Sequence, residues 1–414
     1  PALIVAPTSL MHNWFKEAEK FTPELKVLLL QGPDRHQNFE QIPHYDIVLT
    51  TYPLLARDEE QLKQYEYHQL ILDEAQNIKN PRAKAAQVVR QLKARHRLCL
   101  TGTPMENHLG ELWALFYFLM PGFLYSQEIF NKKYRHPIEK RGDQQLRQKL
   151  VNRIKPFILR RLKTDVAKEL PEKTTIEVNI DMNDQQSKLY EAVRATMQEN
   201  IQKIVAEKGF KRSQIQILDA LLKLRQVCCH PSLLKLDSVK TGQAHSAKLE
   251  QLMDMVVPMV EEGRKILIFS QFTSMLELIE QQLHHAEIGY VKLTGKTKKR
   301  DEVITAFQSG QVPVFLISLK AGGVGLNLTA ADTVIHYDPW WNPAAEDQAS
   351  DRAWRIGQDK PVFVYKLITN KSIEEKILAL QQNKAELAQS ILSTDHEGEA
   401  KLTENDVMNL FEKF

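Results

Sequence analysis

Leu70-Ile71-Leu72-Asp73-Glu74-Ala75-Gln76 is the stretch from which the fold can be predicted. Its three consecutive aliphatic residues predict a strand buried on both faces, as in a parallel sheet. Two carboxylates follow where that strand ends, and in open α/β sheets ligands bind beyond the carboxyl ends of the strands. Asp73 is therefore a candidate ligand for Mg²⁺, and Glu74 a candidate to polarise a water molecule that attacks a γ-phosphate. The alternative is that these acidic residues cap the following helix.

Length and composition are ordinary for a soluble globular protein. The chain has 414 residues, enough for two or three domains, and 43% of them are hydrophobic and 26% charged. The net charge of +3 indicates that any nucleic-acid surface is a local patch. The three cysteines form no CxxC pair, which favours a reducing compartment. No apolar run reaches the length of a membrane span and no signal peptide is present, so we expect no membrane partner.

Strands and helices alternate through the first half of the chain, which predicts a parallel sheet with right-handed crossovers. Several strands end in hydroxyl and turn residues, as in Pro7-Thr8-Ser9, Thr50-Thr51-Tyr52 and Thr101-Gly102-Thr103-Pro104. Such ends suit the phosphate oxygens of a nucleotide or of a nucleic-acid backbone, although each alone is also an ordinary cap or turn. The predicted strands are Ala2–Ala6, Val27–Leu30, Asp46–Tyr52, Leu70–Leu72 and Arg97–Leu100.

Four of these segments resemble successive motifs of the Swi/Snf-type ATPases, which belong to the DEAD/DEAH superfamily of nucleic-acid translocases. They are Pro1–Trp14, Thr50–Tyr52, Asp73–Gln76 and Leu100–Asn107, and they occur in the order of the family. The resemblance implies an α/β fold of two RecA-like lobes with parallel sheets, plus helical protrusions and a C-terminal helical brace. It also implies that the acidic motif, Asp73 and Glu74, binds Mg²⁺ and ATP. The implied nucleic-acid contacts of this lobe are Thr8, Ser9, Thr50 and Thr51, and the implied coupling residues are Thr101, Gly102 and Thr103.

Two stretches interrupt the alternation. Between about 109 and 173 the strand rhythm stops, and the resemblance implies a helical insertion in the first lobe. The resemblance also implies that Arg160 and Arg161 in this stretch lie near the cleft between the lobes, whereas the residues by themselves are equally consistent with a solvated helix face. Thr174–Asp181 alternates with period two, and we expect it to close the sheet of the first lobe. Two long helices, Asp184–Gly209 and Ser213–Leu236, resemble the second protrusion of the family.

The alternation then resumes and predicts a second parallel sheet, which makes this a two-lobed protein. Lys296, Lys298, Lys299 and Arg300 form a basic cluster, either solvated surface or a contact to a nucleic-acid backbone. The predicted strands are Lys265–Ser270, Tyr290–Leu293, Val314–Ser318, Thr333–Tyr337 and Val362–Leu367. Their ends resemble family motifs, which implies nucleic-acid contacts by Ser270, Gln271, Thr294, Gly295, Lys320, Gly322 and Gly323 and a nucleotide contact by Gly325.

The segment Asp347–Gln358 resembles the last helicase motif of the family. Arg352 and Arg355 are three residues apart, which predicts that they share one face of a helix. The resemblance implies that both arginines reach across a cleft to the phosphates bound on the first lobe. The alternative is that acidic neighbours on a surface helix pair with them. Trp354 stands where the family usually has His. The implied catalytic residues are thus Glu74, Gln348, Arg352 and Arg355, with Arg352 and Arg355 also binding nucleotide, and Asp338 and Trp340 match coupling positions.

We expect four consecutive parts: a first lobe at 1–182, a helical protrusion and connection at 183–240, a second lobe at 241–370 and brace helices at 371–414. Ser372–Glu375 predicts a capping box at the start of the brace. The phosphate-binding loop of such ATPases, which contains Gly-Lys-Thr, does not occur in this sequence. Thr294–Thr297 contains the letters Gly-Lys-Thr, but it lies in the second lobe and lacks the upstream glycine of that loop. Pro1–Val5 is already a core strand, so we expect a fragment that lacks this loop.

The resemblance implies an ATP-dependent translocase on double-stranded DNA that binds without sequence preference and remodels protein–DNA complexes. Its target would be a DNA-bound protein complex or RNA polymerase. One alternative is a strand-separating helicase or an RNA-dependent ATPase. Another, from a different class, is an inert DNA-binding or scaffold module, because the phosphate-binding loop is absent. We expect a cytoplasmic location at the nucleoid if the protein is bacterial, and a nuclear one if it is eukaryotic.

Overall fold

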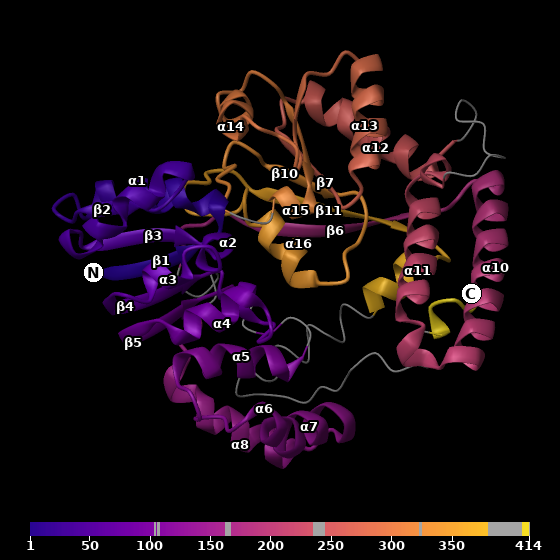
Figure 1. The fold of residues 1–414 in the computed structure, drawn as a ribbon. Coiled ribbons are helices and arrows are strands. Elements are labelled where there is room, and N and C mark those ends of the chain that lie inside the picture. The colour runs from indigo at the N-terminus through magenta and orange to yellow at the C-terminus, as the bar shows by residue number, and fades with distance from the viewer. Residues whose placement is uncertain are drawn as a thin grey trace. The chain divides into compact units, whose positions relative to one another are not determined.

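The computed structural model describes residues 1–102, 105, 108–161, 167–234, 245–322, 325–379 and 408–413. The chain divides into two compact units, one formed by Pro1–Leu159 and one that begins at Arg160 (Figure 1). Each unit contains one sheet of parallel strands, so the prediction of two α/β lobes is confirmed. Within the described ranges, no helix combines the length and the apolar character that crossing a membrane would require.

The first sheet has the strand order β2-β3-β1-β4-β5, and all of its pairings are parallel. Successive residues of its central strand enter different cores, since Leu3 and Val5 join one hydrophobic cluster and Ile4 joins another. This burial of both faces is what a run of aliphatic residues predicts. The strands are β1 (Ala2–Ala6), β2 (Val27–Leu29), β3 (Ile47–Thr51), β4 (Glu66–Asp73) and β5 (Lys93–Leu100).

Short helices connect these strands, and α1 packs against β2 and β3. Its bounds are Met11–Phe21. The helices of this part are η1 (Thr8–Leu10), α1 (Met11–Phe21), η2 (Pro33–His44), α2 (Tyr52–Leu55), α3 (Glu59–Leu62), η3 (Ala75–Ile78) and α4 (Lys84–Gln91).

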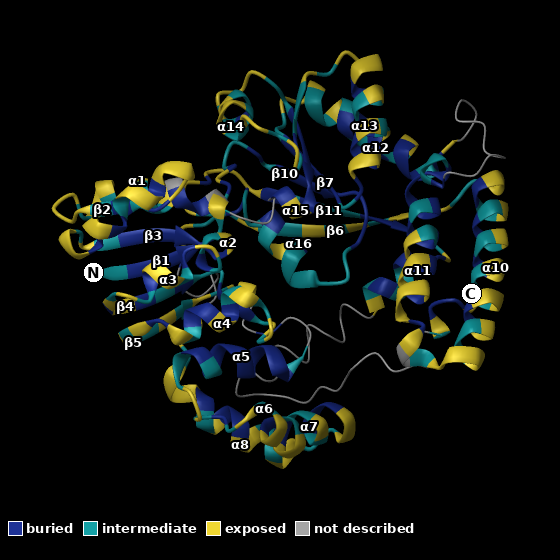
Figure 2. Ribbon diagram, viewed as in Figure 1, coloured by how far each residue is buried: buried dark blue, intermediate teal, exposed yellow. Residues whose placement is uncertain are grey.

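A helical insertion follows the first sheet, as the loss of strand rhythm after residue 109 predicts. Its first helix packs against β5 and is buried around most of its circumference (Figure 2). The insertion has a hydrophobic core of its own, which includes Trp113 and Phe130. Its helices are α5 (Leu109–Leu119), α6 (Gln127–Phe130), η4 (Asn131–Arg135), α7 (His136–Arg141), α8 (Gln144–Ile154) and η5 (Lys155–Phe157).

The second sheet has the order β6-β11-β10-β7-β9-β8 and is also parallel throughout. Its inner strand β7 is fully buried, with Ile266 and Ile268 in one cluster and Leu267 and Phe269 in another. The strands are β6 (Lys173–Ile180), β7 (Ile266–Ser270), β8 (Tyr290–Leu293), β9 (Val314–Ser318), β10 (Thr333–His336) and β11 (Val362–Thr369).

The place of β6 corrects one prediction. The sequence pattern predicts that Thr174–Asp181 closes the first sheet, but β6 pairs with β11 along its whole length, from Lys173 opposite Val362 to Ile180 opposite Thr369. Period-two alternation identifies a strand with one partly exposed face, but it carries no information about which distant strand supplies the hydrogen bonds. The strand predicted for the first lobe therefore belongs to the second.

Two long helices, α10 and α11, pack against each other where the sequence predicts two long helices. The core between them includes Ile373, Ile377 and Phe411 from the end of the chain. Residues 380–407 and 414 of the expected brace lie outside the described residues. The helices of this unit are α10 (Asp184–Lys208), η6 (Phe210–Arg212), α11 (Gln214–Cys229), η7 (Pro231–Leu233), α12 (Ala247–Glu261), α13 (Thr273–His285), α14 (Arg300–Gln308), α15 (Leu319–Gly322) and α16 (Pro343–Ser350).

Candidate active site

The register of the first sheet brings its predicted site residues to one edge. Thr51 is paired with the last residue of β1, and Asp73 with the last residue of β5. Thr101 follows β5 directly, and Thr8 follows the end of β1 after one intervening residue. Because all these strands are parallel, the four residues lie at the carboxyl edge, where ligands bind in α/β sheets.

Asp73 is held in place by three hydrogen bonds. The indole Nε1 of Trp14 donates to Asp73 Oδ2 at 2.8 Å, and the backbone N–H of Glu74 donates to Oδ1 at 2.9 Å. The hydroxyl of Tyr52 donates to the backbone carbonyl of Asp73 at 2.7 Å. Burial raises the pKa of Tyr52, so its phenol stays protonated and remains a donor. Each carboxylate oxygen can accept more than one interaction, so the Asp73 side chain still fits a metal ligand.

Glu74 has an uncommon backbone conformation, with φ 50° and ψ 53° in the left-handed region. Its carboxylate accepts a hydrogen bond of 2.6 Å from Gln76 Nε2, and Gln76 Oε1 accepts one of 2.8 Å from Thr101 Oγ1. The ends of β4 and β5 are thus joined through side chains. Glu74 occupies the N-cap position of η3, but its side chain makes no capping hydrogen bond there, so capping does not account for the placement of its carboxylate.

A cavity of about 600 Å³ opens beside this edge. Thr8 and Thr51 line it together with the exposed side chains of His36 and Arg57. Arg35 also lines it, and its guanidinium makes two 2.7 Å hydrogen bonds to the buried carboxylate of Asp58. Sequence reasoning missed these basic residues, because single histidines and arginines in loops follow no pattern.

Thr50 differs from the adjacent Thr51, which lines the cavity. Its side chain is fully buried, and its Oγ1 has no hydrogen-bond partner among the described residues. A contact of Thr50 with nucleic acid therefore stays a prediction that would require its side chain to become accessible.

In the second unit, Asp338 organises the ends of β7 and β10. Ser270 Oγ donates to Asp338 Oδ1 at 2.5 Å, and the backbone N–H of Gln271 donates to Oδ2 at 3.3 Å. Burial raises the pKa of Asp338 to about 6, although the charge of Arg225 and the Ser270 hydrogen bond oppose the increase. Ser270 is only 1% exposed, so in this structure its hydroxyl is a buried hydrogen-bond donor to Asp338.

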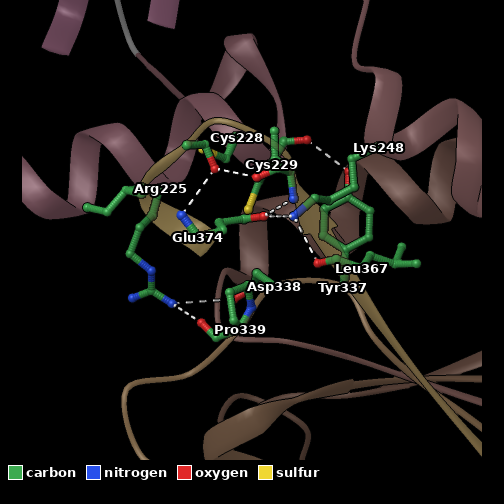
Figure 3. A network of polar contacts seen from close by, with 12 residues as sticks. Arg225, Cys228, Cys229, Lys248, Tyr337, Asp338, Pro339, Leu367 and Glu374 are labelled. Carbon is green, nitrogen blue, oxygen red and sulfur yellow. Dashed lines mark hydrogen bonds and ion pairs between the residues drawn. The ribbon is translucent and has the colours of Figure 1, made fainter. Parts of the chain in front are cut away.

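Arg225 on α11 is a second residue that sequence reasoning missed. Its Nη2 donates to the carbonyl of Pro339 at 2.6 Å and lies 3.9 Å from the Asp338 carboxylate (Figure 3). The guanidinium also lies 5.9 Å from the ring of Trp340 and 5.4 Å from that of Trp341. The long helix α11 thereby fixes the segment that carries two expected coupling residues, Asp338 and Trp340.

The remaining predicted nucleic-acid residues of this unit lie at strand ends and on α15. Thr294 accepts a 3.3 Å hydrogen bond from the backbone N–H of Lys296, and Gly295 and Lys320 are exposed. Gly322 lies within α15, and Gly323 lies outside the described residues. In the first unit, Ser9 lies within η1, and the expected coupling residue Thr103 lies outside the described residues.

Arg352 and Arg355 do not lie on a helix, so the prediction that they share one face of a helix is wrong. Helix α16, which carries Gln348, ends at Ser350, and both arginines lie in the turns that follow. The carbonyl of Arg352 accepts a 3.0 Å hydrogen bond from the backbone N–H of Leu328, so it is bonded to a distant loop instead of to the next helical turn. We call residues 351–358 the arginine turn.

The arginine turn is anchored to the loop that contains Gly325, which has φ 71°. Arg355 Nη1 lies 3.4 Å from the carbonyl of Leu326. The side chain of Gln358, 6% exposed, donates to the carbonyls of Thr329, Ala331 and Ala353. The nucleotide-binding candidates of this unit, Gly325 and the two arginines, are therefore neighbours in space.

Family models match most of the chain. The SNF2-related domain matches residues 1–233, and the helicase conserved C-terminal domain matches residues 247–357. A putative ATP-dependent helicase/translocase of Bacillus subtilis is 40% identical over 405 residues, which cover 96% of this chain and 44% of that protein. An ISWI chromatin-remodeling complex ATPase of Saccharomyces cerevisiae is 34% identical over 412 residues, which cover 95% of this chain and 36% of that protein. The chain thus spans less than half the length of these relatives.

A solved SWI2/SNF2 ATPase core of Sulfolobus solfataricus in complex with double-stranded DNA is 39% identical, with a TM-score of 0.46, and covers 95% of this chain and 82% of that one. The SNF2-related match runs through β6, α10 and α11 and so includes part of the second unit. Because that match alone covers more than half of the sequence, the chain belongs to the SNF2-related family.

Proposed function

We propose that this chain forms the motor core of an ATP-dependent translocase on double-stranded DNA that remodels protein–DNA complexes. The observation that carries the proposal is the hydrogen-bonded series Glu74–Gln76–Thr101 beside Asp73, at the carboxyl edge of the first sheet. It joins the candidate catalytic carboxylate to the end of the neighbouring strand. Two relatives, one named a putative ATP-dependent helicase/translocase and the other a chromatin-remodeling complex ATPase, support the proposal.

The residues of the edge fit distinct tasks in ATP hydrolysis. Asp73 would hold Mg²⁺, which prefers oxygen ligands and is commonly bound by one or two carboxylates plus substrate phosphates. The ion would neutralise charge on those phosphates. Glu74, fixed by its backbone and by Gln76, would orient the attacking water. Arg352 and Arg355 would stabilise the charge of the transition state, with Gln348 and Gly325 as further candidates in the second unit.

The cavity beside Thr8 and Thr51 supports the binding of a polyanion. The hydroxyls of Thr8 and Thr51 and the exposed, positively charged side chain of Arg57 line it, and such groups commonly contact phosphate oxygens. Contacts of this kind give sequence-independent binding with a strong dependence on salt. Thr294, Gly295, Lys320 and Gly322 are the corresponding candidates in the second unit.

The test is phosphate release from ATP by the full-length protein, measured without nucleic acid, with duplex DNA, with single-stranded DNA and with RNA. We expect stimulation by duplex DNA and displacement of a triplex-forming third strand without separation of the duplex. Separation of duplex strands would favour a helicase, and stimulation by RNA alone would favour an RNA-dependent ATPase. Absence of any nucleotide binding would favour an inert scaffold. The proposed remodelling target, a DNA-bound protein complex or RNA polymerase, would be tested by its ATP-dependent release from DNA.

A further inference from the structure

The arginine turn has a second anchor, on the side of Trp354. The indole Nε1 of Trp354 donates a 2.8 Å hydrogen bond to the carbonyl of Pro171. The ammonium of Lys173 lies 4.7 Å from the centre of the indole ring and 3.4 Å from Asp351 Oδ1. Leu170 packs against the same hydrophobic cluster that contains Trp354. We call these contacts of residues 170–173 with Trp354 and Asp351 the tryptophan clasp.

The clasp joins parts of the chain that are far apart in sequence. Residues 170–172 lead into β6, which begins at Lys173, and they belong to the second unit, as Trp354 does. Trp354 lies between the two arginines in the sequence. It is only 8% exposed, so its ring is packed inside the protein and is not a surface side chain. A buried indole needs a partner for its N–H, and here that partner is the carbonyl of Pro171, just before β6.

We propose that the tryptophan clasp is a positioning device, through which Lys173 at the start of β6 and the three residues before it set the placement of Arg352 and Arg355. The clasp fixes one side of the arginine turn, and the contacts of Gln358 and Leu328 fix the other. A shift of residues 170–173 would therefore reach the arginines through Trp354. The catalytic part of this inference rests on the proposed function, whereas the positioning part concerns the structure alone.

The variants Trp354→Phe and Lys173→Met separate the contributions of the clasp. Trp354→Phe keeps an aromatic ring but removes the N–H donor, and Lys173→Met keeps an unbranched chain but removes the charge. Trp113→Phe is the matched control, because Trp113 is also buried and its Nε1 also donates to a backbone carbonyl, that of Tyr125 at 3.1 Å. Trp113 belongs to the helical insertion of the first unit and is not part of the clasp.

The first measurement is hydrogen exchange of the peptides that span residues 326–331 and 351–358 in the full-length protein. Exchange in Trp354→Phe should be roughly fivefold faster there, the factor expected when one hydrogen bond is removed, and unchanged in Trp113→Phe. Unchanged exchange in both clasp variants would overturn the positioning role. This measurement needs no ATPase activity, so it stands even if the proposed function fails.

The second measurement is steady-state ATP hydrolysis at a temperature where all variants are folded. Both clasp variants should lose about tenfold or more in kcat with little change in KM, because displacing a catalytic group by about 1 Å can cost roughly 10²-fold. Trp113→Phe should keep the parental kcat. If Trp354→Phe exchanges faster yet retains kcat, the clasp positions the turn but not the catalytic arginines, and the proposal is wrong in its catalytic part. A parent protein without ATPase activity would instead contradict the proposed function.

Discussion

Glu74 shows most clearly how a single residue is prepared for chemistry. A left-handed backbone is uncommon for a residue with a side chain and costs on the order of 1 kcal/mol, which neighbouring contacts must offset. Here the Tyr52 hydroxyl bonds the preceding carbonyl, and Gln76 bonds the carboxylate. The strained residue is also the one that the sequence predicts to polarise water, and strain of this kind concentrates at functional sites.

Glu74→Gln should block hydrolysis while ATP binding persists. An amide has nearly the shape of the carboxylate but cannot act as a base, and removal of general-base catalysis costs roughly 10²–10⁴ in rate. Phosphate release and binding of a fluorescent ATP analogue by the full-length protein would be compared. Glu66→Gln is the control, since Glu66 is exposed at the other end of β4. Near-parental turnover in Glu74→Gln would remove Glu74 from the mechanism.

His336 gives a prediction about pH that needs no ligand. It is buried at the end of β10, its Nε2 lies 2.8 Å from Ser350 Oγ, and burial lowers its pKa to about 4. Between the ordinary histidine pKa of about 6.5 and this value, the unfolded chain binds a proton that the folded one does not. The free energy of unfolding should therefore fall as the pH is lowered from 6.5 towards 4, with a slope from this group of up to about 1.4 kcal/mol per pH unit.

Urea unfolding at several pH values would measure this slope. His336→Gln should have a shallower decrease of stability below pH 6.5 than the parent, and His36→Gln, at an exposed position, should not. Equal slopes in the parent and in His336→Gln would show that the buried imidazole does not set the acid sensitivity.

At the scale of elements, a buried ion pair fastens the start of the C-terminal helix to the second lobe. Lys248 on α12 and Glu374 are 1% and 0% exposed and contact each other (Figure 3). Lys248 also donates to the carbonyl of Leu367, and Glu374 accepts from the backbone N–H of Thr369 at 2.8 Å. Both charges are thus surrounded by strand β11 and by the helix start.

Lys248→Met should destabilise the second lobe by roughly 3–5 kcal/mol, because it leaves a buried carboxylate without its counter-charge. The double variant Lys248→Met/Glu374→Gln should recover much of that stability, since the neutral amide can still accept from Thr369. Lys203→Met, which breaks an exposed pair with Glu199, should change stability by less than about 1 kcal/mol. Thermal unfolding would measure all three, and a double variant as unstable as Lys248→Met would contradict this account of the pair.

The basic cluster before α14 offers a test of nucleic-acid binding by one element. Lys298 and Lys299 are exposed, and Lys299 lies 2.8 Å from Glu302 on the same surface. If Lys298, Lys299 and Arg300 bind phosphates, their joint replacement by Ala should lower the slope of log affinity against log salt by about 0.9 for each phosphate that is no longer neutralised. Replacing the exposed Lys132, Lys140 and Arg141 of the helical insertion is the control of equal charge. An unchanged slope would identify the cluster as solvated surface.

At the scale of the whole molecule, catalysis by two lobes is the central prediction. Glu74 belongs to the first unit and Arg355 to the second, and each is fixed within its own unit. A residue that stabilises charge on a transferred phosphoryl group acts only in the transition state. The effect of Arg355 on turnover therefore reports whether the two units share one site.

Arg355→Ala should lower ATP turnover by a factor of roughly 10³–10⁵ with much less effect on ATP binding. Arg355→Lys should rescue little, because an ammonium lacks the planar fork of donors. Arg212→Ala, at an exposed arginine of the second unit, is the control. Duplex-DNA binding without nucleotide should be unchanged in all three variants. Turnover within a few-fold of the parent in Arg355→Ala would mean that the units do not share a catalytic site.

Local sequence patterns were sufficient to predict the parallel sheets, the carboxyl-edge placement of Asp73, Glu74, Thr8 and Thr101, and the family. Aliphatic runs specify buried strands, and short motifs lie at the ends of those strands. The pairing of β6 with β11, the turn that carries the arginines, and the support from Arg225 and the tryptophan clasp became evident only in three dimensions. The physical reason is that β6, Arg225 and Trp354 are held by hydrogen bonds between residues more than a hundred positions apart, and no local pattern encodes the partner of such a bond.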